Sequence, residues 1–135
     1  MFVDTNDYLS VIDVRSLGVL ESEITDLRSQ SEQRAIELIS SYLRNRYDVN
    51  VIFAATGDQR NSAVVSWVVD ISLYNMTSRV PGRMSGDLRK ERYDNVVSEL
   101  RAIAKGEITR GLPVLNADPG NPIKFGSQKQ YNNRW

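Results

Sequence analysis

The side chains of this 135-residue chain that could do chemistry are carboxylates, lysines, tyrosines and arginines, because the chain contains no cysteine and no histidine. The absence of cysteine excludes disulfides, thiolate metal sites and cysteine nucleophiles. The absence of histidine removes the commonest general base and the commonest metal ligand, and with them serine–histidine hydrolases and most transition-metal sites. We therefore expect no catalytic residues, no cofactor and no metal.

Three patterns among the remaining residues could hold a ligand, and each fits a structural role better. The glycines of "TGDQRN" and "VPGRMSGD" follow no clear strand in a Walker or dinucleotide pattern, so they indicate turns rather than a phosphate cradle. Asp87, Glu91 and Asp94 would have to converge in a cleft for acid–base catalysis, whereas they fall mostly on a solvated helix face. "NADPGNP" lacks the spacing of a calcium loop and also predicts a turn.

Charged residues are balanced in number, 17 basic against 17 acidic, but they are unevenly distributed. Residues 1–33 carry seven acids and two arginines, a net charge of −5, so the rest of the chain is +5. Arginine outnumbers lysine 13 to 4, which favours fixed pairing at protein interfaces. The alternative is DNA binding or DNA packaging through a group of cations that has acids interleaved with it: Arg79, Arg83, Arg89, Lys90 and Arg92.

A long amphipathic helix is predicted from Ser29 or Ser31, either of which can cap it, to about Tyr47. At ~100° per residue, its apolar side chains occupy one half of the helix surface. Arg46 is the charged residue on that half, where an unpaired charge is costly.

Asp70 is the charged residue inside the next apolar segment, so we predict a structural ion pair between Arg46 and Asp70 that fixes the register of two packed helices. In the alternative, Arg46 extends to solvent and caps carbonyls at the end of its own helix. Arg46 is structural in both interpretations.

Two further helices are predicted. The segment that begins at Asn61 or Ser62 is apolar on almost all sides, as expected of a central helix, although its β-branched residues also fit a strand. The last helix begins at Ser85 or Asp87 and ends before Gly106, a suitable residue for a helix C-terminus. Its amphipathic stripe and the capping signals at both its ends predict the same helix.

Shorter elements precede and separate these helices. Capping residues at positions 4–6 predict a short helix through Ile12, and residues 14–27 fit a loop and another short helix. Residues 51–54 predict a short extended piece, which a turn at Gly57 follows.

Residues 111–135 have no helical period and contain three prolines, three glycines and four asparagines. They also contain large apolar residues, which a disordered tail usually lacks, so the segment lies either over its own domain or against a partner. In the second case the segment is an extended arm, and the residues that would bind a subunit or partner are Ile123, Phe125, Tyr131, Arg134 and Trp135.

The predicted fold class is therefore all-α, a small bundle of about four helices in one domain. The helical domain covers residues 1–110 and the arm covers residues 111–135. The chain has no apolar run of about 18 residues, and its first 25 residues lack a basic and then apolar leader pattern. We expect a soluble protein that is neither secreted nor held in a membrane.

Three motifs carry a resemblance to a known family. The first long helix ends in Tyr42, Leu43, Arg46 and Tyr47; the middle helix contains the run Asp70, Ile71, Ser72, Leu73, Tyr74, Asn75 and Met76; and the last helix carries Arg92, Tyr93, Val97, Leu100, Ile103, Ala104, Gly106 and Ile108. In these residues the chain resembles the small helical head–tail connector (adaptor) proteins of tailed bacteriophages, particularly the Mu-like branch. The resemblance covers about residues 3–110.

The resemblance implies a structural virion protein without catalysis. Such subunits form a homo-oligomeric ring, typically a dodecamer, between the portal protein and the tail or a second connector protein. DNA passes through the channel of the ring without sequence-specific binding, and no membrane is involved. The implied location is the head–tail junction of the virion, after synthesis in the host cytoplasm. The acidic N-terminal region and the more basic remainder would help neighbouring subunits meet around such a ring.

Overall fold

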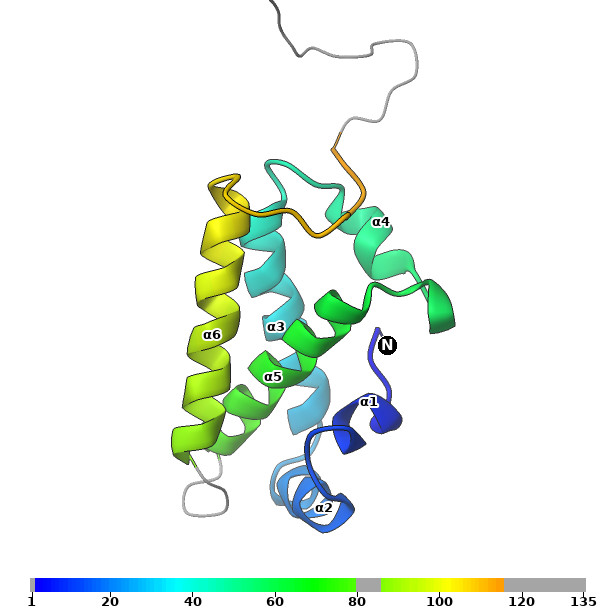
Figure 1. The fold of residues 1–135 in the computed structure, drawn as a ribbon. Coiled ribbons are helices and arrows are strands. Elements are labelled where there is room, and N and C mark those ends of the chain that lie inside the picture. Colours follow the sequence, from blue (N-terminus) through cyan, green and yellow to red (C-terminus); the bar gives the residue numbers. More distant parts are fainter. Residues whose placement is uncertain (1, 80–85, 116–135) are drawn as a thin grey trace, which may run out of the picture.

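The computed structural model describes residues 2–79 and 86–115, which form a bundle of helices (Figure 1). The described part of the chain contains no strand, so the all-α prediction is confirmed. In chain order the helices are α1 (Thr5–Leu9), α2 (Val14–Glu23), α3 (Leu27–Leu43), α4 (Val49–Ala54), the short 3-10 helix η1 (Gly57–Gln59), α5 (Ser62–Arg79) and α6 (Gly86–Ala104).

Polar side chains at the starts of the helices satisfy backbone N–H groups that have no partner inside the helix. In α1 the carboxylate of Asp4 accepts from the N–H of Asp7, and the carboxylate of Asp7 accepts from the N–H of Asp4, a reciprocal capping box. The Asp48 side chain accepts from the first turn of α4, and Asn61 accepts from two N–H groups at the start of α5. The predicted start of α5 at Asn61 or Ser62 is thus confirmed.

The C-terminus of α6 is closed by Gly106, which has a φ of 83°. The N–H of Gly106 donates to the carbonyl of Ile103, and the N–H of Glu107 donates to the carbonyl of Ala102. These two bonds are those of a Schellman motif, which satisfies carbonyls that the helix itself leaves free. The predicted role of Gly106 is confirmed.

Two short-range predictions were wrong. Helix α3 begins at Leu27, before the predicted Ser29 or Ser31, because Asp26 turns the chain in a left-handed conformation with a φ of 61°. Residues 51–54 lie within α4 rather than in an extended piece. An apolar run this short has no resolvable period, and the Asp48 cap decides in favour of a helix.

Helix α5 is the centre of the bundle and packs against α3, α6 and α1 (Figure 1). Nine of its 18 residues are buried, and they lie around most of the helix. This agrees with the prediction of a central helix covered on several sides and excludes the strand alternative. Helix α6 contacts α3 and α5, whereas α1 and α2 pack on α5 and α3, on the side away from α6 in Figure 1.

A buried polar network joins the N-terminal helices to α3. Glu32 is 1% exposed, and its Oε2 accepts from the Tyr8 hydroxyl at 2.6 Å and from Arg28 Nε at 3.0 Å. Arg28 also donates to Glu21 in α2 at 3.0 Å. Burial and the Glu32 carboxylate both raise the pKa of Tyr8 far above its ordinary value. Tyr8 therefore stays protonated and keeps donating this hydrogen bond.

A second ion pair fixes the start of the chain. Arg60 Nη1 lies 2.6 Å from Asp7 Oδ2 and 2.8 Å from the carbonyl oxygen of Phe2. Burial alone would raise the pKa of Asp7, but the Arg60 guanidinium and the Asp4 backbone outweigh it and hold that pKa below its usual value. The α1 region is thereby tied to the loop before α5.

Candidate interaction site

Backbone hydrogen bonds fix the C-terminal segment to one end of the bundle. The N–H of Asp48 donates to the carbonyl of Pro113 at 2.9 Å, and the N–H of Leu115 donates to the carbonyl of Arg46 at 2.9 Å. The N–H of Asp48 and the carbonyl of Arg46 both belong to the link between α3 and α4. The segment therefore crosses from the end of α6 to α4 over the end of α3 (Figure 1).

The same two backbone bonds pair Tyr47 with Val114 as an isolated antiparallel bridge. The Leu112 side chain completes the attachment, since it is 6% exposed and belongs to the core. The packed chain thus extends at least to residue 115, beyond the domain boundary at residue 110 that the sequence predicts. The sequence left open whether the C-terminal segment lies over its own domain or against a partner. Residues 112–115 lie over their own domain.

Arg46 connects the ends of α3 and α6 beneath this segment. Its Nε donates to the carbonyl of Ala104 at 3.0 Å, so it caps a helix other than its own. A Cβ added to Gly106 would lie only 2.9 Å from Arg46 Nη2, which shows how closely the guanidinium approaches that backbone. The prediction that Arg46 is structural agrees with this contact.

The predicted ion pair between Arg46 and Asp70 was wrong, because the two residues lie at different levels of the bundle. Asp70 lies in the middle of α5, and its Oδ1 accepts from Arg92 Nε of α6 at 2.9 Å. The sequence did contain a signal for Arg92, since it lies one helical turn before buried Val96 on the core-facing side of α6. Both Asp70 and Arg92 belong to the motifs that carry the family resemblance.

The motif tyrosines also join helices to each other. The rings of Tyr74 in α5 and Tyr93 in α6 stack with centroids 4.2 Å apart and planes inclined by 21°. Burial and the neighbouring Tyr74 raise the pKa of Tyr93. The motifs therefore place interhelical contacts along the α3, α5 and α6 core rather than a catalytic arrangement.

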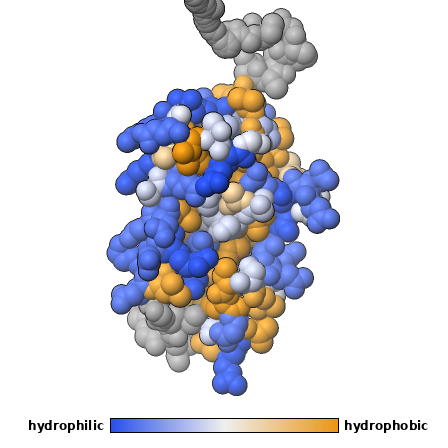
Figure 2. All heavy atoms as spheres, in the orientation of Figure 1, coloured by the Kyte–Doolittle hydropathy of each residue, from blue (hydrophilic) through white to orange (hydrophobic). Residues whose placement is uncertain are grey.

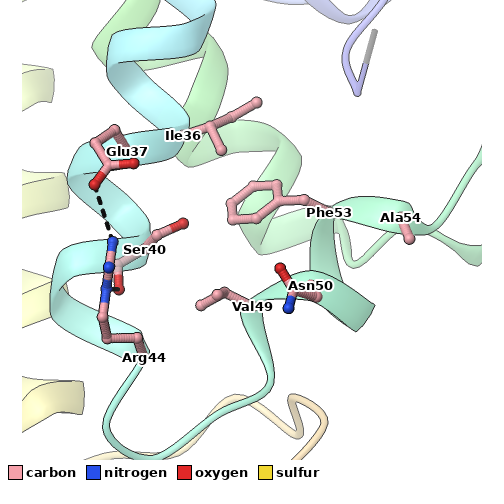
Figure 3. A pocket seen from close by; sticks show the side chains of 8 residues that line it. All are labelled: Ile36, Glu37, Ser40, Arg44, Val49, Asn50, Phe53 and Ala54. Carbon is pink, nitrogen blue, oxygen red and sulfur yellow. Dashed lines mark hydrogen bonds and ion pairs between the residues drawn. The ribbon is translucent and has the colours of Figure 1, made fainter.

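A groove with a volume of about 680 Å³ opens between α3 and α4 (Figure 3). Figure 3 shows the apolar side chains of Ile36, Val49 and Phe53 pointing into it, and polar residues rim it, including Glu37 and Arg44, which pair at 3.0 Å. Sequence reasoning missed this groove, because treating residues 51–54 as extended hides the α4 side that faces α3.

Exposed apolar side chains surround the place where the described chain stops. Val114 is 64% exposed, Leu115 is 46% exposed, and Val51 on neighbouring α4 is 52% exposed. Figure 2 shows hydrophobic surface directly beneath the end of the coloured chain. This end of the bundle thus carries both the groove and exposed apolar surface.

Some predicted site residues lie outside the described residues. These are the five of the predicted arm, namely Ile123, Phe125, Tyr131, Arg134 and Trp135, together with Arg83 and Ser85.

Most cations of the DNA-binding alternative are buried or paired in the described part of the chain. Arg89 is buried, Lys90 pairs with Asp94 at 2.8 Å, and Arg92 pairs with Asp70, whereas Arg79 is exposed in the last turn of α5. Paired or buried cations are less available to phosphates than solvated ones. Asp87, Glu91 and Asp94 are exposed, as predicted for a solvated helix face.

Within residues 2–79 and 86–115, no group of three acidic side chains is arranged to hold a metal ion. None of the helices in the same part of the chain is long and apolar enough to cross a membrane.

Together, the fold and this site define a small all-α protein in which residues 112–115 are fixed at one end of a three-helix core. A family model described as "Bacteriophage Mu, Gp36" matches residues 5–127, which is most of the chain. The protein therefore belongs to the bacteriophage Mu Gp36 family and is a phage structural or morphogenesis protein. A search of curated proteins and a search of solved structures returned no match.

Proposed function

We propose that this phage protein is a connector subunit without catalytic activity, which assembles with further copies as a ring between the portal and the tail. The observation that carries the proposal is the seat of residues 112–115 at one end of the bundle. A further 20 residues follow Leu115 in the sequence. At ~3.3–3.6 Å per residue, an extended chain of that length spans up to about 70 Å, enough to reach a neighbouring subunit or the portal.

The groove between α3 and α4 is the place we propose for the arm of a neighbouring subunit. The groove is apolar at its base, and the residues beyond Leu115 include Phe125, Tyr131 and Trp135. Aromatic side chains bury a large area at little cost in conformational entropy, so they suit such a groove as anchors.

Capture from a phage lysate tests the connector role, with the bound proteins identified by mass spectrometry. Tagged full-length protein is compared with a chain that ends at Leu115, which retains every packed residue described above. We expect the full-length chain alone to capture the portal, recognised as a large ring-forming phage protein. Equal capture by both chains would contradict a binding role for the arm, and nuclease-sensitive capture of DNA would favour the DNA-binding alternative.

Crosslinking tests the place of the arm. Benzoylphenylalanine replaces Phe125, and copies labelled with ¹⁴N and ¹⁵N are mixed so that crosslinks between copies differ in mass from crosslinks within one copy. We expect mixed-mass crosslinks to α3 or α4, and expect Asn50→Trp, which fills the groove, to abolish them. Arg34→Trp is the matched control, because Arg34 is exposed on α3 but does not line the groove.

A further inference from the structure

Arg89 is a buried cation on the core-facing stripe of α6. It is 6% exposed, and it lies seven residues before Val96 and fourteen before Ile103, which are both buried on the same stripe. Among the residues that the structure describes, its Nη1 finds no hydrogen-bond partner. A buried guanidinium with an unsatisfied N–H is costly, so a protein that retains one has a use for it or a partner that arrives later.

Charge near Arg89 is incompletely balanced within the described residues. Asp70, which is 6% exposed, is the carboxylate that faces this part of α6, and its Oδ1 already accepts from Arg92. Burial lowers the pKa of Arg89, the neighbouring Arg92 lowers it further, and Asp70 offsets only part of this. Two guanidinium groups thus share one carboxylate.

Solvent reaches this cluster through Arg92. The Arg92 side chain is 37% exposed, and together with Asp70, Ser66 and Asn95 it lines a groove of about 360 Å³ between α5 and α6. Glu99 and Arg110 also line this groove, and they balance each other as an ion pair. A carboxylate that entered this groove would meet the exposed guanidinium of Arg92 first. Asp70 would then be free to turn toward Arg89, and two carboxylates would balance two guanidinium groups.

We propose that the groove between α5 and α6 binds an acidic side chain of a second copy of this chain, and that Arg89 is retained for this contact at a cost to the stability of the isolated protomer. The proposal rests on the proposed function only in that a ring supplies the second copy.

Charge complementarity selects the second copy as the occupant. Residues 1–33 carry a net charge of −5, and exposed acids from this region, Asp4, Glu21 and Asp26, line a single groove of about 470 Å³. Arg28 also lines this groove and balances Glu21, so the groove remains acidic through Asp4 and Asp26. Helices α1 and α2 lie on the side of the bundle away from α6 (Figure 1). An acidic N-terminal region on one side of the protomer and the uncompensated charge of Arg89 on the other suit head-to-tail association, which closes into a ring without a self-complementary patch.

The decisive variant is Arg89→Met, because we expect it to stabilise the protomer and at the same time to weaken self-association. Methionine fills a similar volume without a charge, so we expect the Tm of the protomer to rise by about 3 °C or more. We expect self-association, measured by sedimentation equilibrium of the full chain, to weaken by at least about tenfold, since a close charge pair across an interface is lost. The matched control is Arg34→Met on the exposed side of α3, which should change neither quantity.

Asp26→Asn tests the other half of the contact without touching the core. Asp26 is exposed and makes no capping bond to α3, and asparagine tolerates its left-handed backbone conformation as aspartate does, so the Tm should be unchanged while self-association weakens.

Four results would overturn the proposal. A lower Tm for Arg89→Met would show that Arg89 stabilises the protomer itself, and unchanged self-association of both variants would show that neither residue is at the interface. Wild-type protein that stays monomeric up to about 1 mM, the weakest association commonly measured, would exclude the second copy. Salt-sensitive DNA binding that Arg89→Met removes would identify the anion as phosphate. The connector role is tested separately by portal capture, which does not depend on self-association in solution.

Discussion

At the scale of single residues, Gly106 is the position where an added side chain is disfavoured for two reasons. Its φ of 83° disfavours any side chain, and a Cβ there would press on the guanidinium of Arg46. We predict that Gly106→Ala lowers the free energy of unfolding by about 1–2 kcal/mol, measured by urea denaturation followed by circular dichroism.

Gly18 provides the opposite case within the same chain. It lies inside α2, and an added Cβ would have no heavy atom within 4 Å. Gly18→Ala should therefore raise the free energy of unfolding by about 0.5–1 kcal/mol, because alanine has the higher helix propensity. Equal effects of the two substitutions would contradict the account of the Arg46 contact.

Asp7 and Arg60 make the stability of the protein depend on pH in the acid range. The pKa of Asp7 is lower in the folded chain than the value of about 3.9 expected for the unfolded chain. The stabilisation is therefore fully present above about pH 5 and is lost as the pH falls through 3.9 and then through the folded-state pKa.

Asp7→Asn should lower the free energy of unfolding by about 1–3 kcal/mol at pH 7, since it leaves the largely buried Arg60 without its charged partner. Its difference from the wild type should shrink at pH 3, where the wild-type carboxylate is itself being protonated. Urea denaturation at pH 7, 5 and 3 measures both effects. Glu91→Gln, an exposed change on α6, is the control and should show no such pH-dependent difference.

At the scale of elements, the start of α5 depends on one side chain. Asn61 Oδ1 accepts from the N–H groups of Ala63 at 2.9 Å and Val64 at 3.2 Å. Asn61→Ala should lower the Tm by an amount that corresponds to about 1 kcal/mol, whereas Asn61→Ser should retain most of the stability because serine also caps helices. Equal loss in both variants would indicate that the side chain acts through a contact other than the cap.

The long helices could be predicted from the sequence because each carries its own periodicity and end signals. The contacts between them could not, as the Arg46 and Asp70 pair shows. A helical projection gives the side of the helix on which a residue lies, but the level along the bundle depends on how the helices are offset. Arg46 follows the last turn of α3 and lies level with Ala104, whereas Asp70 lies level with Arg92. The groove beside α4 was missed for a related reason, since a six-residue helix leaves too short a pattern to identify.

At the scale of the whole molecule, the folded unit includes residues that have no helical pattern. Leu112 belongs to the core, and residues 113–115 bond to the link between α3 and α4. We predict that a chain ending at Leu115 has the same Tm as the full-length protein. A chain ending at Arg110 should lose about 2–3 kcal/mol of stability, mainly because the core loses the buried Leu112 side chain. Differential scanning calorimetry of the three chains measures this, and equal stability of the two shortened chains would contradict it.

The attachment of residues 112–115 also determines how the protein responds to mechanical load. A pull applied at Leu115 is carried first by two backbone hydrogen bonds and one buried leucine side chain, all of which are far weaker together than the packed core of α3, α5 and α6. Under tension this segment should detach first, lengthening the tether by several residues while the bundle remains folded. The attachment of residues 112–115 thus gives the protein an extensible joint, which would absorb strain if the chain beyond Leu115 were held.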